Sequence, residues 1–189
     1  LPEGEATMES FKNSDKLIAL FSRVSYSFAD KYLLMASVRR EGSSKFGNDH
    51  KWGYFPGVSL GWRMNKENFM NGISWIDNLK LRTGFGITGT NVLDSYNSLS
   101  SLDYSDYFYY DGKWVRKLVP VRNDNPDLRW EKKEEINFGV DFDLFGGRIS
   151  GSLDYYQRTT KDALYNYDVP TPPYLYGTIT ANVGKIENK

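Results

Sequence analysis

The segment LKLRTGFGIT, residues 79–88, alternates between two kinds of side chain and decides the fold. Its odd positions carry leucine, threonine, phenylalanine and isoleucine, whereas its even positions carry lysine, arginine, glycine and threonine. Successive side chains of a β-strand point to opposite faces of the sheet, so this pattern predicts a strand with one apolar and one polar face.

Five other segments repeat this period of two and extend the prediction along the chain. They begin at Ile18, Tyr32, Trp52, Glu135 and Ile149. Most predicted strands span about 10 to 14 residues, which is longer than an ordinary soluble strand and long enough to cross a bilayer at a tilt. No segment shows a convincing helical period. The sequence therefore predicts an all-β protein with about six strands.

The connections between the predicted strands differ systematically in length. In an antiparallel meander, alternate connections lie at the same end of the sheet. The shorter connections would share one end, at 29–30, 65–78 and 146–147. The longer ones would share the other end, at 41–50, 89–127 and 161–185. Outer-membrane barrels have short periplasmic turns and long extracellular loops. The pattern favours an antiparallel up-and-down meander that forms part of a transmembrane outer-membrane β-barrel.

Aromatic side chains gather near the strand ends that carry the shorter connections. They are Tyr26, Phe28, Tyr32, Trp62 and Trp75. Aromatic girdles of this kind flank the apolar band of a membrane barrel. Alternation alone also fits a soluble carbohydrate-binding β-sandwich, in which the apolar face is buried and these aromatics belong to its core. Pattern alone leaves both architectures open.

Composition excludes several kinds of chemistry. The 189 residues include no cysteine and one histidine, His50, which excludes zinc fingers, iron–sulfur clusters, disulfides and Cys–His nucleophile pairs. The formal net charge is zero, so we do not expect nucleic-acid binding through phosphate neutralisation. The acidic residues of segment 131–135 flank two lysines, as charges lining a barrel do, rather than forming the isolated pair that a glycosidase needs. We expect no enzyme activity, no cofactor and no metal.

Five stretches of the chain keep an order and spacing typical of a known family. They are KYLLMASVRREGSSKFG (31–47), WGYFPGVSLGWRM (52–64), IDNLKLRTGFGITGTN (76–91), NDNPDLRWEKKEEINFGVDFDLFGGRISGSLDYYQRTTKDAL (123–164) and NVGKIENK (182–189). Together they resemble the barrel region of SusC/RagA-type TonB-dependent outer-membrane transporters. Small departures occur at Glu41, Gly57, Phe85 and Lys133, where that family usually has Asp, Ser, Tyr and Thr. None of them changes size or charge enough to threaten the fold.

The resemblance implies more than the pattern shows. Members of this family are plugged barrels in the outer membrane of Gram-negative cells; they pair with a SusD-like surface lipoprotein and import oligosaccharides or peptides with energy from the TonB complex. The plug and the TonB box would lie upstream of Leu1. We expect a poorly defined leading segment at 1–15 and a partial barrel domain at 16–189.

Two aromatic-rich segments are the candidate recognition sites. Their residues are Tyr104, Tyr107, Tyr109, Tyr110 and Trp114 within 89–127, and Tyr165 and Tyr167 within 161–185. Aromatic rings offer flat apolar faces to the C–H surfaces of sugars, and the aspartates of the first segment could accept hydrogen bonds from sugar hydroxyls. The same rings would suit contact with the lipoprotein, because tyrosine and tryptophan are enriched at protein interfaces. Both roles remain open, and the sequence does not distinguish a sugar from a peptide as the ligand.

Overall fold

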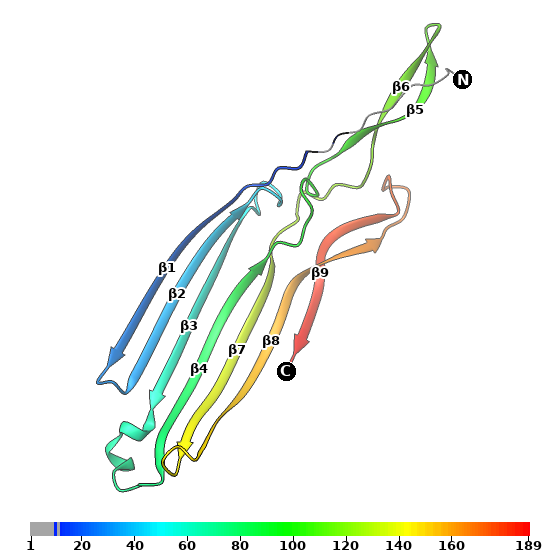
Figure 1. Cartoon of the computed structure of the whole chain (residues 1–189). Helices are drawn as coiled ribbons and strands as arrows, with labels where there is room; N and C mark the ends of the chain where they lie inside the picture. The colour runs from blue at the N-terminus through cyan, green and yellow to red at the C-terminus, as the bar shows by residue number, and fades with distance from the viewer. Residues whose placement is uncertain (1–9, 11) are drawn as a thin grey trace.

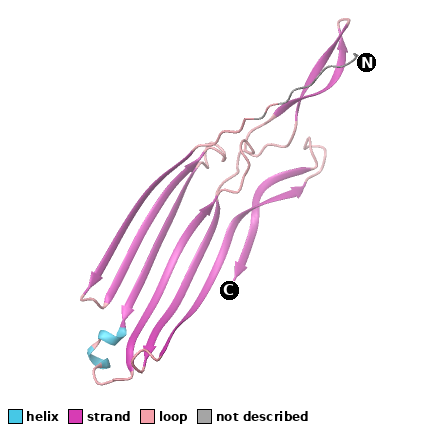
Figure 2. Ribbon diagram, viewed as in Figure 1, coloured by secondary structure: helices cyan, strands magenta, loops and turns pink. Residues whose placement is uncertain are grey.

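A computed structural model describes residue 10 and residues 12–189 of the chain; of the predicted leading segment, 1–9 and 11 lie outside the described residues (Figures 1 and 2). The strands are β1 (Leu17–Phe28), β2 (Tyr32–Ser43), β3 (Trp52–Arg63), β4 (Ile76–Thr90), β5 (Leu102–Tyr110), β6 (Lys113–Pro120), β7 (Glu131–Leu144), β8 (Ile149–Asp168) and β9 (Thr178–Asn188). Two short 3-10 helices, η1 (Met64–Lys66) and η2 (Asn68–Met70), connect β3 to β4. Among the described residues, no helix has the length and apolar character needed to cross a membrane.

The strands form one long antiparallel meander. Seven of them pair in the order β1-β2-β3-β4-β7-β8-β9, and β5 pairs with β6 in a separate hairpin inserted between β4 and β7. The connections 44–51, 91–130 and 169–177 lie at one end of the sheet, which we call the loop end, and the shorter connections lie at the other, the turn end (Figure 1). The predicted meander and the predicted segregation of its connections are confirmed.

The prediction of about six strands was too low, because the loop expected at 89–127 contains β5 and β6, and the loop expected at 161–185 was too long. β8 continues to Asp168 and β9 begins at Thr178. The reason is a β-bulge: Asp162 has a positive φ of 55°, and the register with β9 shifts between Thr160 and Ala163. The extra residue breaks the period of two, so the outer half of β8 does not look like a continuation of the same strand.

The register gives the sheet one apolar and one polar face. Directly paired residues share a face. One continuous row of the apolar face contains Leu34, Leu60, Thr83, Phe138 and Tyr155. The neighbouring row on the polar face contains Met35, Ser59, Gly84, Asn137 and Tyr156. The alternation first seen in 79–88 therefore extends across the sheet.

No part of the described chain forms a second layer over the apolar face. Leu60 of β3 is 52% exposed and Leu153 of β8 is 70% exposed, although both lie within paired strands. Within the described part of the chain, the cluster of buried apolar side chains is small and lies at the loop end. The soluble-sandwich alternative is wrong for this chain, because a sandwich would cover this face with a second sheet.

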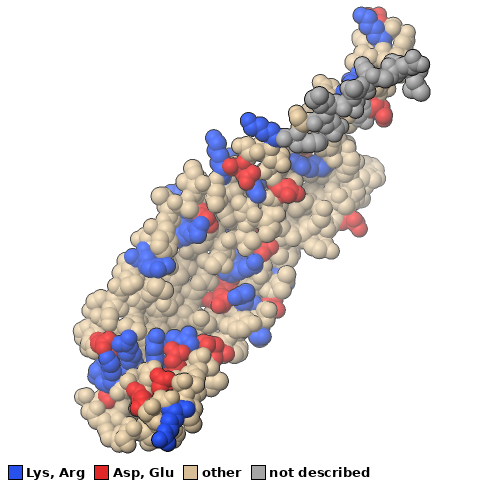
Figure 3. Space-filling view, in the orientation of Figure 1, with Lys and Arg blue, Asp and Glu red and all other residues tan. Residues whose placement is uncertain are grey.

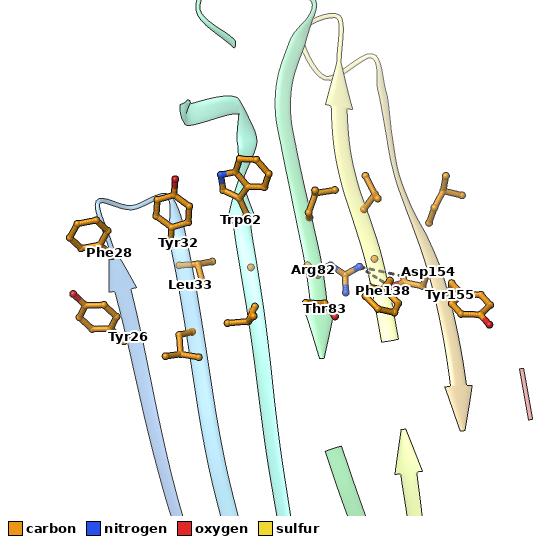
Figure 4. A pocket seen from close by; sticks show the side chains of 17 residues that line it. Tyr26, Phe28, Tyr32, Leu33, Trp62, Arg82, Thr83, Phe138, Asp154 and Tyr155 are labelled. Carbon is orange, nitrogen blue, oxygen red and sulfur yellow. Dashed lines mark hydrogen bonds and ion pairs between the residues drawn. The ribbon is translucent and has the colours of Figure 1, made fainter. Parts of the chain in front are cut away.

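Aromatic rings line the turn end of the apolar face, as predicted. Tyr32 stacks on Phe28 with ring centroids 6.4 Å apart and on Trp62 at 6.5 Å, and Tyr26 lies beside them (Figure 4). Trp75 precedes β4, and its ring stacks on Phe145 at 5.9 Å. These rings form a band across β1, β2 and β3 that continues at the start of β4.

Candidate functional site

A small aromatic core holds the connections of the loop end together. Phe46, from the β2–β3 connection, lies 4.8 Å from the Trp130 ring, and Phe55 of β3 meets the same ring edge-on at 5.4 Å. The Trp130 Nε1–H donates to the Lys51 carbonyl at 3.0 Å, and Leu128 beside it is fully buried. Motif residues at 43–47 and 123–130, distant in sequence, therefore pack against each other and anchor the loops.

Gly47 makes this packing possible. Its backbone N–H donates to the Leu128 carbonyl at 3.2 Å, so the β2–β3 connection and the end of the β4–β7 connection lie in close contact. A Cβ at position 47 would lie 1.6 Å from the carbonyl oxygen of Pro126. A side chain other than hydrogen would force the two connections apart.

Three asparagines tie the long β4–β7 connection to β9 and the loop before it. Asn123 accepts backbone hydrogen bonds from Leu175 and Tyr176, at 3.1 and 3.2 Å. Asn125 Nδ2 donates to the Thr180 carbonyl at 2.9 Å. Asn182 accepts from the Arg129 backbone N–H at 3.0 Å and donates to its carbonyl at 2.8 Å. These side chains take the place of ladder hydrogen bonds and fix the base from which the β5–β6 hairpin leaves the sheet.

The β5–β6 hairpin projects away from the sheet beyond the loop end (Figure 1). Its pairing brings four of the predicted tyrosines and tryptophans to one face. These are Tyr104, Tyr107, Tyr109 and Trp114, which we call the hairpin aromatic face. Tyr109 meets Trp114 edge-on at 5.4 Å, and the Arg116 guanidinium lies 5.1 Å from the Tyr104 ring and 5.8 Å from the Tyr107 ring.

Tyr110 does not join this face. It pairs with Lys113 and lies on the opposite side, where its ring is 6.4 Å from that of Phe108. Both sides of the hairpin are open, since Tyr109 is 63% exposed and Tyr110 is 69% exposed. The sequence analysis did not include Arg116, which the pairing of β5 with β6 brings between two of the predicted rings.

The second predicted pair lies apart from the hairpin aromatic face. Tyr165 and Tyr167 are in β8, paired with Ala181 and Ile179 of β9. The two segments approach each other at the base of the hairpin, where the Tyr176 hydroxyl donates to the Pro120 carbonyl. The structure thus contains two separate aromatic areas at the loop end and does not unite all seven residues in one site.

Ion pairs cross the polar face between neighbouring strands. Arg82 donates to both carboxylate oxygens of Asp141, each at 2.8 Å, and to Asp154 at 3.0 Å, as the dashed lines to Asp154 in Figure 4 show in part. Arg158 pairs with Glu135 farther toward the loop end. In Figure 3, charged side chains lie in the middle of the visible face of the sheet and gather near the turn end. Acidic and basic groups alternate on the polar face. The face can therefore be hydrated, and its electrostatic potential is not dominated by charge of one sign.

Glu67 organises the turn end. Its Oε1 accepts from the Tyr32 hydroxyl at 2.7 Å and from Trp62 Nε1–H at 3.0 Å, and its Oε2 accepts from Lys31 Nζ at 3.1 Å. The hydrogen bond from Tyr32, then those from Trp62 and Lys31, lower the pKa of Glu67 to about 2. The carboxylate joins the β1–β2 turn to the β3–β4 connection and orients two rings of the aromatic band.

The acidic residues of the described chain are dispersed rather than clustered around a metal site. Among the described residues there is no cluster of three or more His, Cys, Asp or Glu side chains that could hold a metal ion. The arrangement offers a two-faced wall, an anchored set of loops and an exposed aromatic hairpin.

Comparisons with known proteins agree with this geometry. Residues 4–189 match the family model described as TonB dependent receptor-like, beta-barrel. The chain is 40% identical over 173 residues to TonB-dependent receptor P39 of Formosa agariphila, covering 92% of this chain and 16% of that protein. It is 35% identical over 184 residues to TonB-dependent receptor SusC of Bacteroides thetaiotaomicron, covering 95% and 18%.

A solved structure shows the same arrangement of strands. The RagAB peptide importer in its open-open state matches with a TM-score of 0.83 and 28% identity, over 92% of this chain and 18% of that one. The chain spans less than a fifth of the length of these relatives. The family match, the meander and the two-faced sheet lead to one conclusion: the chain belongs to the TonB-dependent receptor β-barrel family and forms a section of the barrel wall.

Proposed function

We propose that this chain is part of the wall of a nutrient importer in the outer membrane of a Gram-negative cell, driven by a TonB complex and paired with a SusD-like surface lipoprotein. The observation that carries the proposal is the exposed apolar face. In water, an uncovered band of leucine, valine and phenylalanine of this extent would aggregate, whereas lipid is its natural surrounding. The cargo would be an oligosaccharide or a peptide, and no catalytic step is part of the proposal.

The two faces have different roles in this proposal. The apolar face contacts lipid, and the polar face lines the lumen, where water and the plug satisfy its polar groups. The Arg82–Asp141–Asp154 group supports this assignment, because three charges on a lipid-facing surface would be costly. The loop end then faces the cell exterior and the turn end faces the periplasm.

The hairpin would be a docking element for the lipoprotein. A sugar site on a barrel loop needs a cradle that surrounds the ligand, but this ribbon exposes rings on both sides, Tyr109 and Trp114 on one and Phe108 and Tyr110 on the other. Contact with a large protein surface can bury both sides at once. Tyr165 and Tyr167 would form a secondary contact area nearer the barrel mouth.

Alanine substitutions in the full-length transporter test this role. Replacing Tyr107, Tyr109, Tyr110 and Trp114 together should weaken lipoprotein binding at least about tenfold, because aromatic anchors dominate protein interfaces. Barrel assembly should be unchanged. Phe69→Ala, an exposed aromatic at the turn end, is the control.

Separate measurements of lipoprotein binding and of free-ligand capture decide the assignment. Loss of lipoprotein binding with normal ligand capture is expected. Loss of ligand capture alone would assign the rings to substrate, and unchanged values for both would remove the hairpin from recognition altogether. Two double variants then show which side of the hairpin makes the contact. One combines Tyr109→Ala with Trp114→Ala, and the other combines Phe108→Ala with Tyr110→Ala.

A further inference from the structure

Arg40 is a cation on the apolar face. It pairs with Leu20 of β1 and with Tyr54 of β3, and therefore shares a face with both. Its neighbour Arg39 points to the polar face, where it forms an ion pair with Glu41. Among the described residues, no acidic side chain pairs with Arg40. Other charged residues lie on this face near the loop end, among them Glu134 of β7 and Lys161 of β8, but those two form an ion pair with each other. Arg40 has no such partner within the described chain.

The two tryptophans of β3 locate Arg40 relative to the membrane, if the proposed function holds. Trp52 and Trp62 lie at opposite ends of β3, on the same face, because they are ten positions apart and strand side chains alternate with a period of two. Ten steps of about 3.4 Å give about 34 Å along the strand, and a tilt of about 40° reduces this to about 26 Å across the membrane. That distance matches the apolar band of about 25 Å between the two aromatic girdles of an outer-membrane barrel.

Trp52 then lies at the outer lipid–water interface, and Arg40 lies beside it. The Arg40 guanidinium is 4.4 Å from the Trp52 ring and 5.4 Å from the Tyr54 ring. Gly42 keeps the Trp52 ring against β2, since a Cβ at position 42 would lie 2.8 Å from that ring. Two rings thus hold the guanidinium plane at headgroup depth instead of leaving a flexible side chain to find its own position.

This geometry leaves the guanidinium free to bind an anion from the lipid side. Its fork of N–H donors matches the oxygens of a phosphate, and cations near a membrane surface are attracted to anionic headgroups. We propose that Arg40, held by Trp52 and Tyr54, binds a phosphate group of an outer-leaflet lipid. The apolar side chains of this face, including Leu20 beside Arg40 and Val38 one row closer to the turn end, would contact the acyl chains of the same lipid.

Lipid retention by the full-length protein tests the proposal. The protein and its variants are inserted into nanodiscs of phosphatidylcholine containing lipid A with its phosphates, or dephosphorylated lipid A, and the lipid retained after mild detergent extraction is measured by native mass spectrometry. Wild type should retain the phosphorylated form preferentially. Arg40→Gln should lower that retention about fivefold, the scale expected of one interfacial arginine.

Arg23→Gln is the matched control. Arg23 also lies over an aromatic ring, 5.1 Å from that of Phe21, but it pairs with Ser37 on the polar face. It should retain phosphorylated lipid like wild type. Equal retention by wild type and Arg40→Gln, or equal loss in both variants, would overturn the proposal.

Two further measurements distinguish a lipid site from a site for free phosphate, and distinguish failure of the lipid site from failure of the proposed function. Inorganic phosphate at millimolar concentration should not displace the lipid; complete displacement would show a site for free phosphate and contradict the assignment to lipid. Failure of the wild-type protein to insert into nanodiscs as a folded barrel would contradict the proposed function itself, and the lipid site with it. Normal insertion without phosphate-dependent retention would overturn the lipid site alone.

Discussion

Arg82 of β4 donates two parallel hydrogen bonds, each 2.8 Å long, to the carboxylate of Asp141 on β7. This bidentate pair lies on the polar face, one residue away from Leu81 on the apolar face. The same strand thus carries a fixed ion pair toward one side and a half-buried leucine toward the other. This contrast between adjacent positions is what a barrel wall requires, with lipid on one side and water on the other.

Removing the Arg82 side chain should destabilise the barrel modestly. Both partners are about one-third exposed, so solvent screens the pair, and Arg82→Gln should lower the free energy of unfolding by about 1 kcal/mol. The measurement is the denaturant midpoint of the full-length protein. Lys80→Gln, which removes a charge without an ion pair in the described structure, should shift it less. A larger shift for Lys80→Gln would show that the Arg82 pair has no special role.

Gly47→Ala should disrupt the loop end. The added Cβ would collide with the Pro126 carbonyl oxygen, which belongs to the backbone and cannot rotate away, so we expect a loss of about 1 to 3 kcal/mol. Gly86→Ala is the control, because nothing lies within 4 Å of a Cβ at that position. Limited proteolysis of the loops, compared between the two variants, reports the disruption. Equal cleavage in both would mean that the contact of Gly47 with Pro126 does not anchor the connections.

The turn end should lose stability in acid through Glu67. Its pKa is lowered from the usual 4.5 to about 2 in the folded protein, so the unfolded chain binds a proton first as the pH falls. The stabilisation from this carboxylate is therefore complete above about pH 4.5 to 5 and is lost progressively as the pH falls toward 2. The melting temperature of Glu67→Gln, measured over this range, should vary less with pH than that of wild type. Parallel curves for the two proteins would contradict the role of this carboxylate.

The regular parts of the fold could be predicted from the sequence because period two is a local property. The segment 79–88 shows its two faces without reference to any other strand. The predicted end of β8 was too early because the bulge at Asp162 shifts the alternation. The segment 89–127 shows no clear period, so the sequence did not indicate how the hairpin divides its rings: Tyr110 faces away from Tyr109 by alternation, and the register shift between Tyr104 and Tyr107 brings Tyr104 to the face of Tyr109.

The anchor of the loop end could not be predicted in the same way. Phe46 and Trp130 are far apart in sequence, and each stands in a segment without a regular period, so nothing local indicates that their rings meet. The asparagines at 123, 125 and 182 are similar, since an amide side chain that replaces a ladder hydrogen bond looks in sequence like any loop asparagine. The partner of Arg82 was also hidden, because register decides which carboxylate lies opposite.

An arginine placed on either face of β3 tests the central claim most directly. Val58 and Ser59 are adjacent, near the strand centre, and face opposite sides of the sheet. Ser59 is a better choice for the polar face than Gly84, where a Cβ would lie 2.7 Å from Asn137 Oδ1 and steric strain would add to any electrostatic effect. The measurement is the free energy of unfolding of the full-length barrel in lipid bilayers. Val58→Arg should lower it by about 2 to 4 kcal/mol and Ser59→Arg by less than about 1 kcal/mol, whereas equal losses would contradict the assignment of the apolar face to lipid.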